Sequence, residues 1–215
     1  YDEPDTPPRE ARLPALHARE LVAVLEKLAA APRRLSDLGD EVFATVMWNE
    51  TTSQSDGTIR RETRFPADSA ELIYQGPHIY VANPLYKTPR AICDTNLAHD
   101  PLDLTALPAD YLPRTNYVPA CAYADYEGRS PKVPWGERKA VGECFRLVSR
   151  LFLSQAGERT LIPAICPPRT AHVDGCFGQS FADDRTLVSV AAGLASLPFD
   201  FFVKTTGKSH FRADV

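Results

Sequence analysis

Residues 83–134 constrain the fold of this chain more than any other part of its 215 residues. This stretch contains repeated prolines and few periodic patterns, so no long helix or strand is predicted within it. Irregular backbone needs water or side chains for its polar groups, and such segments therefore run over a surface. We expect a fold with long irregular connections, and irregular segments of this length in compact proteins are often functional.

Three other segments have helical patterning. Residues 16–31 place leucines on one stripe, residues 136–153 form the clearest pattern, and residues 185–197 form the third. In the second segment the pattern puts Phe145 on the apolar face and Arg146 on the opposite, solvated face. These three segments are the expected main helices.

Strands are predicted between these helices. Residues 41–47 are apolar, residues 58–65 alternate, and residues 71–82 read as an apolar strand interrupted by a Gly-Pro pair. Residues 160–166 form a β-rich run that two prolines end, and residues 199–203 are aromatic and buried in character. The predicted fold class is α+β, with a mixed or antiparallel sheet.

A hydrophobic content of 44% is sufficient for one sizeable core, or for a core with a smaller annex. We divide the chain into residues 1–40, a proline-rich linker with the N-terminal helix, and residues 41–215, one α+β domain. The chain begins at Tyr1 and contains a single methionine, Met47. We therefore expect it to be a segment of a longer polypeptide that is truncated at its C-terminal boundary.

The cysteines are odd in number, widely spaced and without a C-x-x-C pair, which argues against a zinc site. They are expected to be buried, reduced thiols of a cytoplasmic protein. No apolar run approaches the roughly 20 residues of a membrane helix, so no membrane partner is expected. The cysteines are Cys93, Cys121, Cys144, Cys166 and Cys176.

The charge is unevenly distributed. A net charge of −4 argues weakly against a small free-standing DNA-binding module. Residues 91–128 contain 1 basic and 6 acidic groups, whereas residues 129–169 contain 8 basic and 3 acidic groups. The basic stretch is compatible with a face that meets phosphate and equally with a solvated helix face.

Two ordered motifs carry a resemblance to a known family. Residues 158–168 read ERTLIPAICPP, and residues 201–211 read FFVKTTGKSHF. In this order and spacing they resemble the C-terminal specificity region of large adenine-specific DNA methyltransferases of restriction–modification and phage-defence systems. Residues 47–50, 56–66, 84–90 and 111–117 resemble segments of the very large members, so that the resemblance covers about residues 40–215.

The resemblance implies a DNA-recognition part of a methyltransferase. The parent protein would transfer a methyl group from S-adenosylmethionine to adenine N6 in a domain outside this chain, which would itself hold no cofactor. Its partners would be double-stranded DNA, the rest of the parent polypeptide and other subunits of a defence system. The acidic net charge favours an alternative, a structural element that docks a partner subunit or nuclease without touching DNA. An independent enzyme with a Cys or His centre is the third reading, and the sequence offers no constellation for it.

Residues 83–86, Asn-Pro-Leu-Tyr, resemble the catalytic N-P-P-Y loop of adenine methyltransferases, in which the asparagine and an aromatic ring hold the flipped base. Leu85 replaces the second proline, and no glycine-rich cofactor loop precedes the motif. A turn after a strand is the simpler interpretation. We predict neither a catalytic residue nor a metal ligand in this chain.

The candidate DNA contacts are basic, amide and imidazole groups in irregular segments. Lysines suit phosphate, so Lys204 and Lys208 around Gly207 are the expected phosphate contacts, whereas Arg114 and Asn116 are the expected base readers. The alternatives are arginines paired with nearby aspartates and a plain surface turn around Gly207. The full set is Lys87, Arg90, Arg114, Asn116, Arg159, Arg169, His172, Lys204, Lys208 and His210.

Overall fold

The computed structural model describes residues 6–11, 13–80, 83–95 and 97–212. Its largest sheet has four antiparallel strands in the order β1-β12-β9-β10. These strands are β1 (Val42–Thr45), β12 (Cys176–Phe181), β9 (Arg146–Arg150) and β10 (Pro163–Cys166). Both inner strands, β9 and β12, are buried almost throughout.

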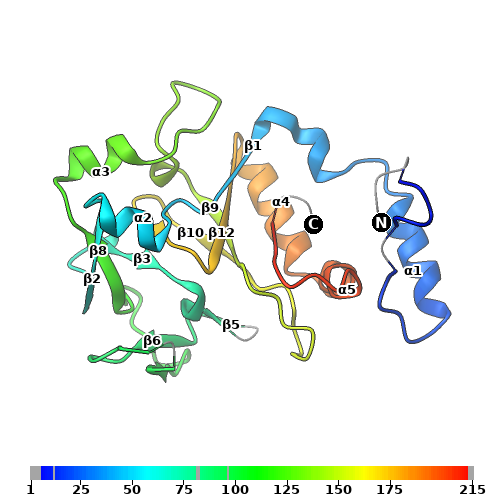
Figure 1. Cartoon of the computed structure of the whole chain (residues 1–215), viewed down its shortest axis with the longest axis horizontal. Coiled ribbons are helices and arrows are strands. Elements are labelled where there is room, and N and C mark those ends of the chain that lie inside the picture. Colours follow the sequence, from blue (N-terminus) through cyan, green and yellow to red (C-terminus); the bar gives the residue numbers. More distant parts are fainter. Residues whose placement is uncertain (1–5, 12, 81–82, 96, 213–215) are drawn as a thin grey trace.

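Two helices, α4 (Asp184–Leu194) and α5 (Leu197–Thr205), cover one face of this sheet (Figure 1). The side chain of Asp183 accepts hydrogen bonds from the first turn of α4, and Ser196 does the same for α5, where a proline follows. The core between helices and sheet is apolar and contains Leu147, Leu151, Phe177, Phe181, Leu187, Leu194 and Val203.

The opposite face of the sheet is covered by short strand pairs and two short helices, which form the other end of the molecule (Figure 1). Two further apolar clusters lie here, around Trp48 and Val133 and around Leu72 and Ile79. The short elements are η2 (Ser69–Glu71), β3 (Ile73–Tyr74), η3 (Gly76–His78), β4 (Ile79–Tyr80), β5 (Asn83–Pro84), β6 (Lys87–Pro89), β7 (His99–Pro101), β11 (Ala171–His172), α2 (Glu50–Ser55), α3 (Tyr123–Arg129) and η4 (Val141–Glu143). The remaining pair, β2 (Ile59–Arg64) and β8 (Thr115–Pro119), forms an antiparallel ribbon.

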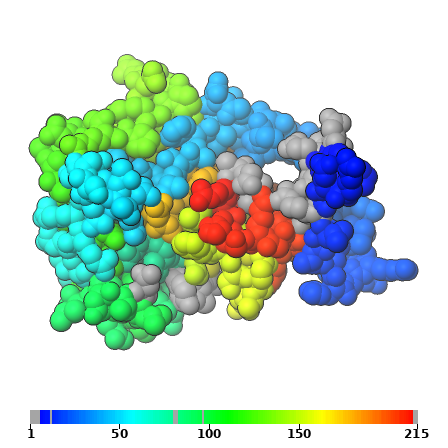
Figure 2. All heavy atoms as spheres, viewed as in Figure 1, coloured from blue at the N-terminus to red at the C-terminus, as the bar shows by residue number. Residues whose placement is uncertain are grey.

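The first helix, α1 (Glu20–Ala29), packs loosely. Within its described residues α1 buries no side chain, and a hollow of about 190 Å³ separates it from Phe202 of α5. A segment of two short 3₁₀ turns, η1 (Leu35–Glu41), kinked at Gly39, leads from it to β1. In the space-filling view the residues around α1 form a lobe at one end of the molecule (Figure 2).

The α+β class and the antiparallel sheet are confirmed. Of the helix predicted over residues 185–197, residues 185–194 lie in α4, and Leu197 already belongs to α5. The Gly-Pro break at residues 76–77 separates β3 from β4 as predicted. Residues 199–203 lie inside α5, where Phe199 remains 43% exposed.

The helix predicted over residues 136–153 is wrong. Residues 146–150 form the inner strand β9, with a short turn of helix, η4, before it. A strand covered on both faces has a continuous apolar run, which is hard to distinguish from a helical pattern. The predicted faces are also reversed, because Arg146 is 0% exposed and Phe145 is 46% exposed.

All five cysteines are free thiols, and four of them are buried, whereas Cys121 is half-buried. Across the described residues, no single helix has the length and apolar character needed to cross a bilayer. Only α4 and α5 taken together, with a bend of 68° between them, meet that test.

Candidate nucleic-acid interface

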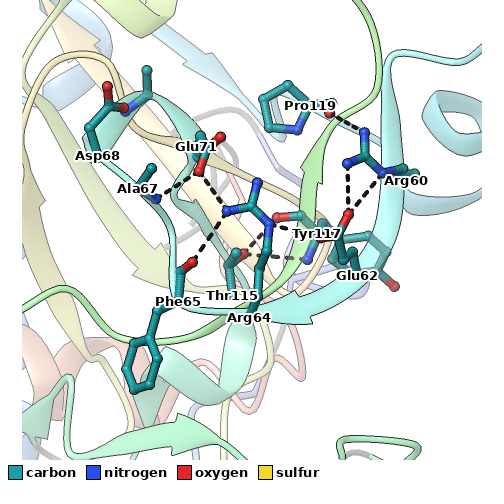
Figure 3. Close-up of polar contacts among 11 residues, drawn as sticks. Arg60, Glu62, Arg64, Phe65, Ala67, Asp68, Glu71, Thr115, Tyr117 and Pro119 are labelled. Carbon is teal, nitrogen blue, oxygen red and sulfur yellow. Dashed lines mark hydrogen bonds and ion pairs between the residues drawn. The ribbon is translucent and has the colours of Figure 1, made fainter. Parts of the chain in front are cut away.

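The ribbon of β2 and β8 presents an unusual row of charged side chains. It lies at the end of the molecule opposite α1 (Figure 1). Ile59 at its start is 1% exposed and anchors the strand in the core, whereas Arg60, Glu62 and Arg64 stand together on the outer side (Figure 3). A register shift between Arg61 and Arg64 marks a bulge, which re-aims side chains locally.

Glu62 joins the two arginines. Its Oε2 accepts from Nε and Nη2 of Arg60 at 2.9 and 2.7 Å, and its Oε1 lies 2.9 Å from Nε of Arg64. Arg60 also donates from Nη1 to the Pro119 carbonyl at 3.0 Å, across the ribbon. Both guanidinium planes are therefore fixed while their side chains remain 54% and 32% exposed.

Glu71 holds Arg64 from the other side. Its Oε2 accepts from Nη1 of Arg64 at 2.7 Å and from the Ala67 backbone N–H at 2.7 Å (Figure 3). The hydrogen bond from Arg64, followed by that from Ala67, lowers the pKa of Glu71 to about 2. The carboxylate is consequently ionised at neutral pH, and Arg64 has a fixed orientation.

The inner side of the ribbon is anchored by a second polar cluster. Arg61 donates from Nη2 to the Cys93 carbonyl at 2.6 Å and from Nη1 to the Tyr117 hydroxyl at 3.3 Å. Burial raises the pKa of Glu50, which hydrogen bonds to Tyr117 and lies near Asp174. These contacts tie the ribbon to α2, so its outer side is free to meet a partner.

A third arginine extends the charged surface beyond the end of β2. The Arg114 guanidinium lies over the Phe65 ring, 4.3 Å from its centroid, and Phe65 is 51% exposed. Nη1 of Arg114 donates to the Pro89 carbonyl at 3.3 Å. We call the set of Arg60, Glu62, Arg64, Phe65 and Arg114 the arginine face.

The structure brings part of the predicted set to this face. Besides Arg114, Lys87 and Arg90 lie on or beside the neighbouring strand β6, where Arg90 pairs with Asp100 at 2.8 Å. Asn116 lies on β8 but is 3% exposed, since it accepts from Thr63 and donates to Cys93 Sγ. Its amide is used inside the fold, which corrects the expectation that it reads bases.

The remaining predicted residues lie elsewhere. His172 is 0% exposed, with Nε2 3.1 Å from the Thr45 carbonyl, and burial lowers its pKa to about 3. Its ring packs so closely on Gly178 that a Cβ there would lie 2.5 Å from it. The imidazole is enclosed in the fold, which corrects the expectation that His172 contacts DNA. Arg169 is exposed, beside α3.

The third group surrounds α5, far from the ribbon in Figure 1. Arg159 lies 3.4 Å from Asp200 and donates to the Ala195 carbonyl, and Lys204 donates to the Gly157 carbonyl at 2.8 Å. His210 contacts Ser209 and the Phe152 ring, and Lys208 follows the left-handed Gly207. These groups contact their own fold, and the structure does not bring them to the arginine face.

The sequence-based choice of residues missed Arg60, Arg61 and Arg64. The sequence contains a signal for these arginines. Residues 59–64 read IRRETR directly after a turn, and the predicted strand carries charged side chains at every second position from 60 to 64. The pairing with β8 shows that this strand is the exposed half of a two-stranded ribbon.

The segment that resembles a catalytic loop forms a hairpin. Asn83 and Pro84 pair with β4, and Leu85 has a left-handed backbone with φ of 62°, while Ala82 lies outside the described residues. No group of three or more His, Cys, Asp or Glu side chains able to hold a metal occurs in the described part of the chain.

No protein-family model, curated protein or solved structure matches this chain. The assignment of a function therefore rests on the geometry of the arginine face together with the sequence resemblance.

Proposed function

We propose that this chain is the DNA-recognition part of an S-adenosylmethionine-dependent adenine-N6 DNA methyltransferase of a restriction–modification or anti-phage system. The observation that carries the proposal is the pair of oriented, partly exposed guanidinium groups of Arg60 and Arg64 on β2, the exposed strand of a two-stranded ribbon whose other strand, β8, is buried.

The chemistry of arginine favours this element. Arginine forms bidentate hydrogen bonds with the O6 and N7 atoms of guanine, which are presented in the major groove. Glu62 and Glu71 fix the guanidinium planes before binding, which reduces the entropy lost when a base is contacted. Arg114, supported by the Phe65 ring, adds a cation suited to phosphate or a base edge.

The catalytic part belongs to the parent polypeptide in this proposal. That part would bind S-adenosylmethionine and transfer the methyl group to adenine N6 in the cytoplasm. The chain described here would position the duplex and supply no catalytic group. Its partners would be double-stranded DNA, the rest of the polypeptide and other subunits of the defence system.

A DNA-binding titration tests the proposal. Wild-type chain and variants are titrated with a mixed-sequence duplex pool and with the duplex it selects, at several salt concentrations. Arg60→Ala and Arg64→Ala should each reduce the slope of log affinity against log salt by about one unit. Each should also weaken binding to the selected duplex by about 1–3 kcal/mol.

Two matched variants sharpen this test. Arg64→Lys keeps the charge but not the bidentate fork, so it should retain the salt slope and lose the preference for the selected duplex. Arg185→Ala removes the same charge from the exposed first turn of α4 and should bind like wild type. If both β2 variants also bind like wild type, the arginine face is not the DNA surface.

A second candidate function is docking of a protein partner without DNA contact. It is favoured by Ile92 and Leu97, which are 82% and 90% exposed in the segment between β6 and β7, beside the exposed Asp94. Exposed apolar side chains of this kind are typical of protein interfaces. Wild-type chain that fails to bind any duplex with a salt-dependent slope would favour this function.

A further inference from the structure

A small hollow lies between α3 and the two segments that carry Gly142 and Arg169. Its volume is about 20 Å³, enough for about one water molecule or one oxygen atom of a ligand. It lies outside the arginine face. The lining residues that matter below are Met47, Tyr123, Tyr126, Glu127, Ser130 and Arg169.

A loosely held cation stands at this hollow. The Arg169 side chain is 56% exposed, and its nearest carboxylate, on Asp68, is 3.8 Å away. Its guanidinium lies 6.0 Å from the centroid of the Tyr123 ring. The backbone of Arg169 is left-handed, with φ of 70°, and its N–H donates to the Gly142 carbonyl at 2.6 Å. The guanidinium is thus held by a long ion pair with Asp68 and by the Tyr123 side chain, and it remains half-exposed.

A second cation lies behind the wall of the hollow. Arg146 is completely buried and donates to the Thr170 carbonyl, the Thr170 hydroxyl and the Val141 carbonyl at 2.6, 2.9 and 3.0 Å. Across the described ranges it forms no ion pair with a carboxylate. In a low-dielectric interior a charge without a counter-ion acts over a longer range than at the surface, so Arg146 and Arg169 both add positive potential at the hollow, against one lining carboxylate, Glu127.

An unused donor also lines the hollow. The Tyr126 hydroxyl accepts from Trp48 Nε1 at 2.8 Å, and Tyr126 is 4% exposed. Within the part of the chain that the structure describes, its own proton has no acceptor. Glu127 is the carboxylate among the lining residues, and it is engaged by the Tyr123 hydroxyl. The wall therefore offers donors and positive charge to an incoming oxygen.

We propose that this hollow is an oxyanion subsite for a phosphate group. One non-bridging oxygen enters the hollow beside the Tyr126 hydroxyl, and Arg169 contacts a second oxygen. The group belongs either to a DNA backbone or to a free phosphate compound. The DNA source rests on the proposed function. It requires α3 to lie near the ribbon, and Arg129 of α3 donates to Thr58 Oγ1 at 2.9 Å, next to the first residue of the ribbon.

The chain offers a closely matched control. Arg138 is also exposed and also has a left-handed backbone, with φ of 55°, but does not line the hollow. Arg169→Ala and Arg138→Ala therefore remove the same charge from the same kind of backbone position. Tyr126→Phe removes only the hydroxyl and leaves the ring in place.

The first arm of the experiment uses inorganic phosphate at constant ionic strength, followed by amide NMR shifts of the 215-residue chain. Wild-type protein should bind phosphate with shifts around residues 123–130 and 169–170. Arg169→Ala should weaken binding about tenfold or more, since a charge-assisted hydrogen bond is lost. Tyr126→Phe should weaken it less, and Arg138→Ala should not. Absence of phosphate binding, or equal effects of the two arginine variants, would overturn the proposal.

The second arm distinguishes the sources. If the phosphate belongs to DNA, Arg169→Ala should also reduce the salt slope of duplex binding by about one unit. If it belongs to a free compound, that slope should remain unchanged. Arg60→Ala and Arg64→Ala should leave the phosphate titration as in wild type. Failure of the arginine face to bind DNA is therefore separable from failure of this subsite.

Discussion

The two halves of the molecule are stabilised by different interactions. In the half built on the four-stranded sheet, α4 and α5 cover a continuous apolar layer. In the half that carries the ribbon, strands of two to six residues are joined by side chains that bond to distant backbone. Examples are Thr115 Oγ1 to the Ile73 carbonyl at 2.9 Å and Arg61 to the Cys93 carbonyl at 2.6 Å.

The difference extends to the exposed edges. Immediately before β10 the Ile162 carbonyl accepts from the Arg150 N–H of β9. Because hydrogen-bonded pairs alternate along an antiparallel ladder, the backbone N–H and C=O positions of residues 163, 165 and 167 point away from β9. Two of these are prolines, which have no N–H to offer a further strand. The β10 edge of the sheet half therefore offers few donors to a further strand, whereas the ribbon half presents charged side chains. We call the first the scaffold half, and in the proposed function the second is the binding end.

The largest expected effect would break the scaffold. Arg146→Ala should lower the free energy of unfolding by at least about 3 kcal/mol, because carbonyls at Val141, Cys144 and Thr170 would lose a buried donor. Phe145→Ala should cost less than about 1 kcal/mol, since its side chain is half-exposed. Urea denaturation followed by circular dichroism measures both, and comparable midpoints would show that Arg146 is not an organising group.

This pair also shows how far the sequence reaches. Periodicity predicted α4, the strands at β1, β2 and β10, and the break at residues 76–77, because in each case one local pattern decides the structure. It failed at β9, which lies between β10 and β12 in the sheet and is covered by α4 on one face and by β4 on the other. Sequence patterns describe neighbours along the chain, and β9 is defined by neighbours in space.

The residues of the candidate site likewise divide into those that the sequence could predict and those that it could not. Arg114 could be predicted because an arginine in an irregular segment is usually exposed. Asn116, only two residues further on, could not be judged, because its burial depends on Thr63 and Cys93. The arginines of β2 became significant only through the pairing with β8 and through Glu71, neither of which the local pattern shows.

The next largest effect is the pH dependence of stability, which depends on two buried histidines, His78 and His172. The backbone N–H of Gln75 donates to Nδ1 of His78, whose Nε2 lies 2.8 Å from the Arg114 carbonyl, so the ring is neutral in the fold. Burial lowers the pKa of His78 to about 4, and that of His172 to about 3. The unfolded chain, with a histidine pKa of about 6.5, binds more protons below that pH.

Stability should therefore fall as the pH decreases from about 6.5 toward 4, by up to about 1.4 kcal/mol per pH unit for each histidine. Urea midpoints at pH 7, 6 and 5 measure this dependence. His78→Asn should be less stable at pH 7 and should have a flatter pH dependence, with the remaining slope due to His172. An unchanged slope in this variant would show that His78 titrates normally in the fold.

A smaller effect is expected at the ribbon. Glu71→Gln should lower stability by about 0.5–1 kcal/mol near neutral pH, since its ion pair with Arg64 is about one-third exposed and screened by solvent. The pKa of Glu71 is lowered in the fold, so this contribution is present above pH 4.5 and is lost as the pH falls toward about 2. Wild type and variant should therefore converge in acid, and a constant difference across that range would contradict the ion-pair origin.

The smallest effect is expected for Lys204→Ala, and it tests whether DNA binding is confined to the half that carries the ribbon. The sequence assigned Lys204 to phosphate contact, with a change of about one unit in salt slope on replacement. In the structure Lys204 lies on α5, in the scaffold half and away from the ribbon (Figure 1), and its ammonium donates to the Gly157 carbonyl. Lys204→Ala should change duplex affinity less than about twofold and leave the slope unchanged, because its ammonium lies in the scaffold half, out of reach of the phosphates of a duplex bound at the arginine face. The same salt titration used for Arg64→Ala measures both quantities. A slope change equal to that of Arg64→Ala would mean that DNA also lies across α5, and the scaffold half would then have to be counted as part of the binding surface.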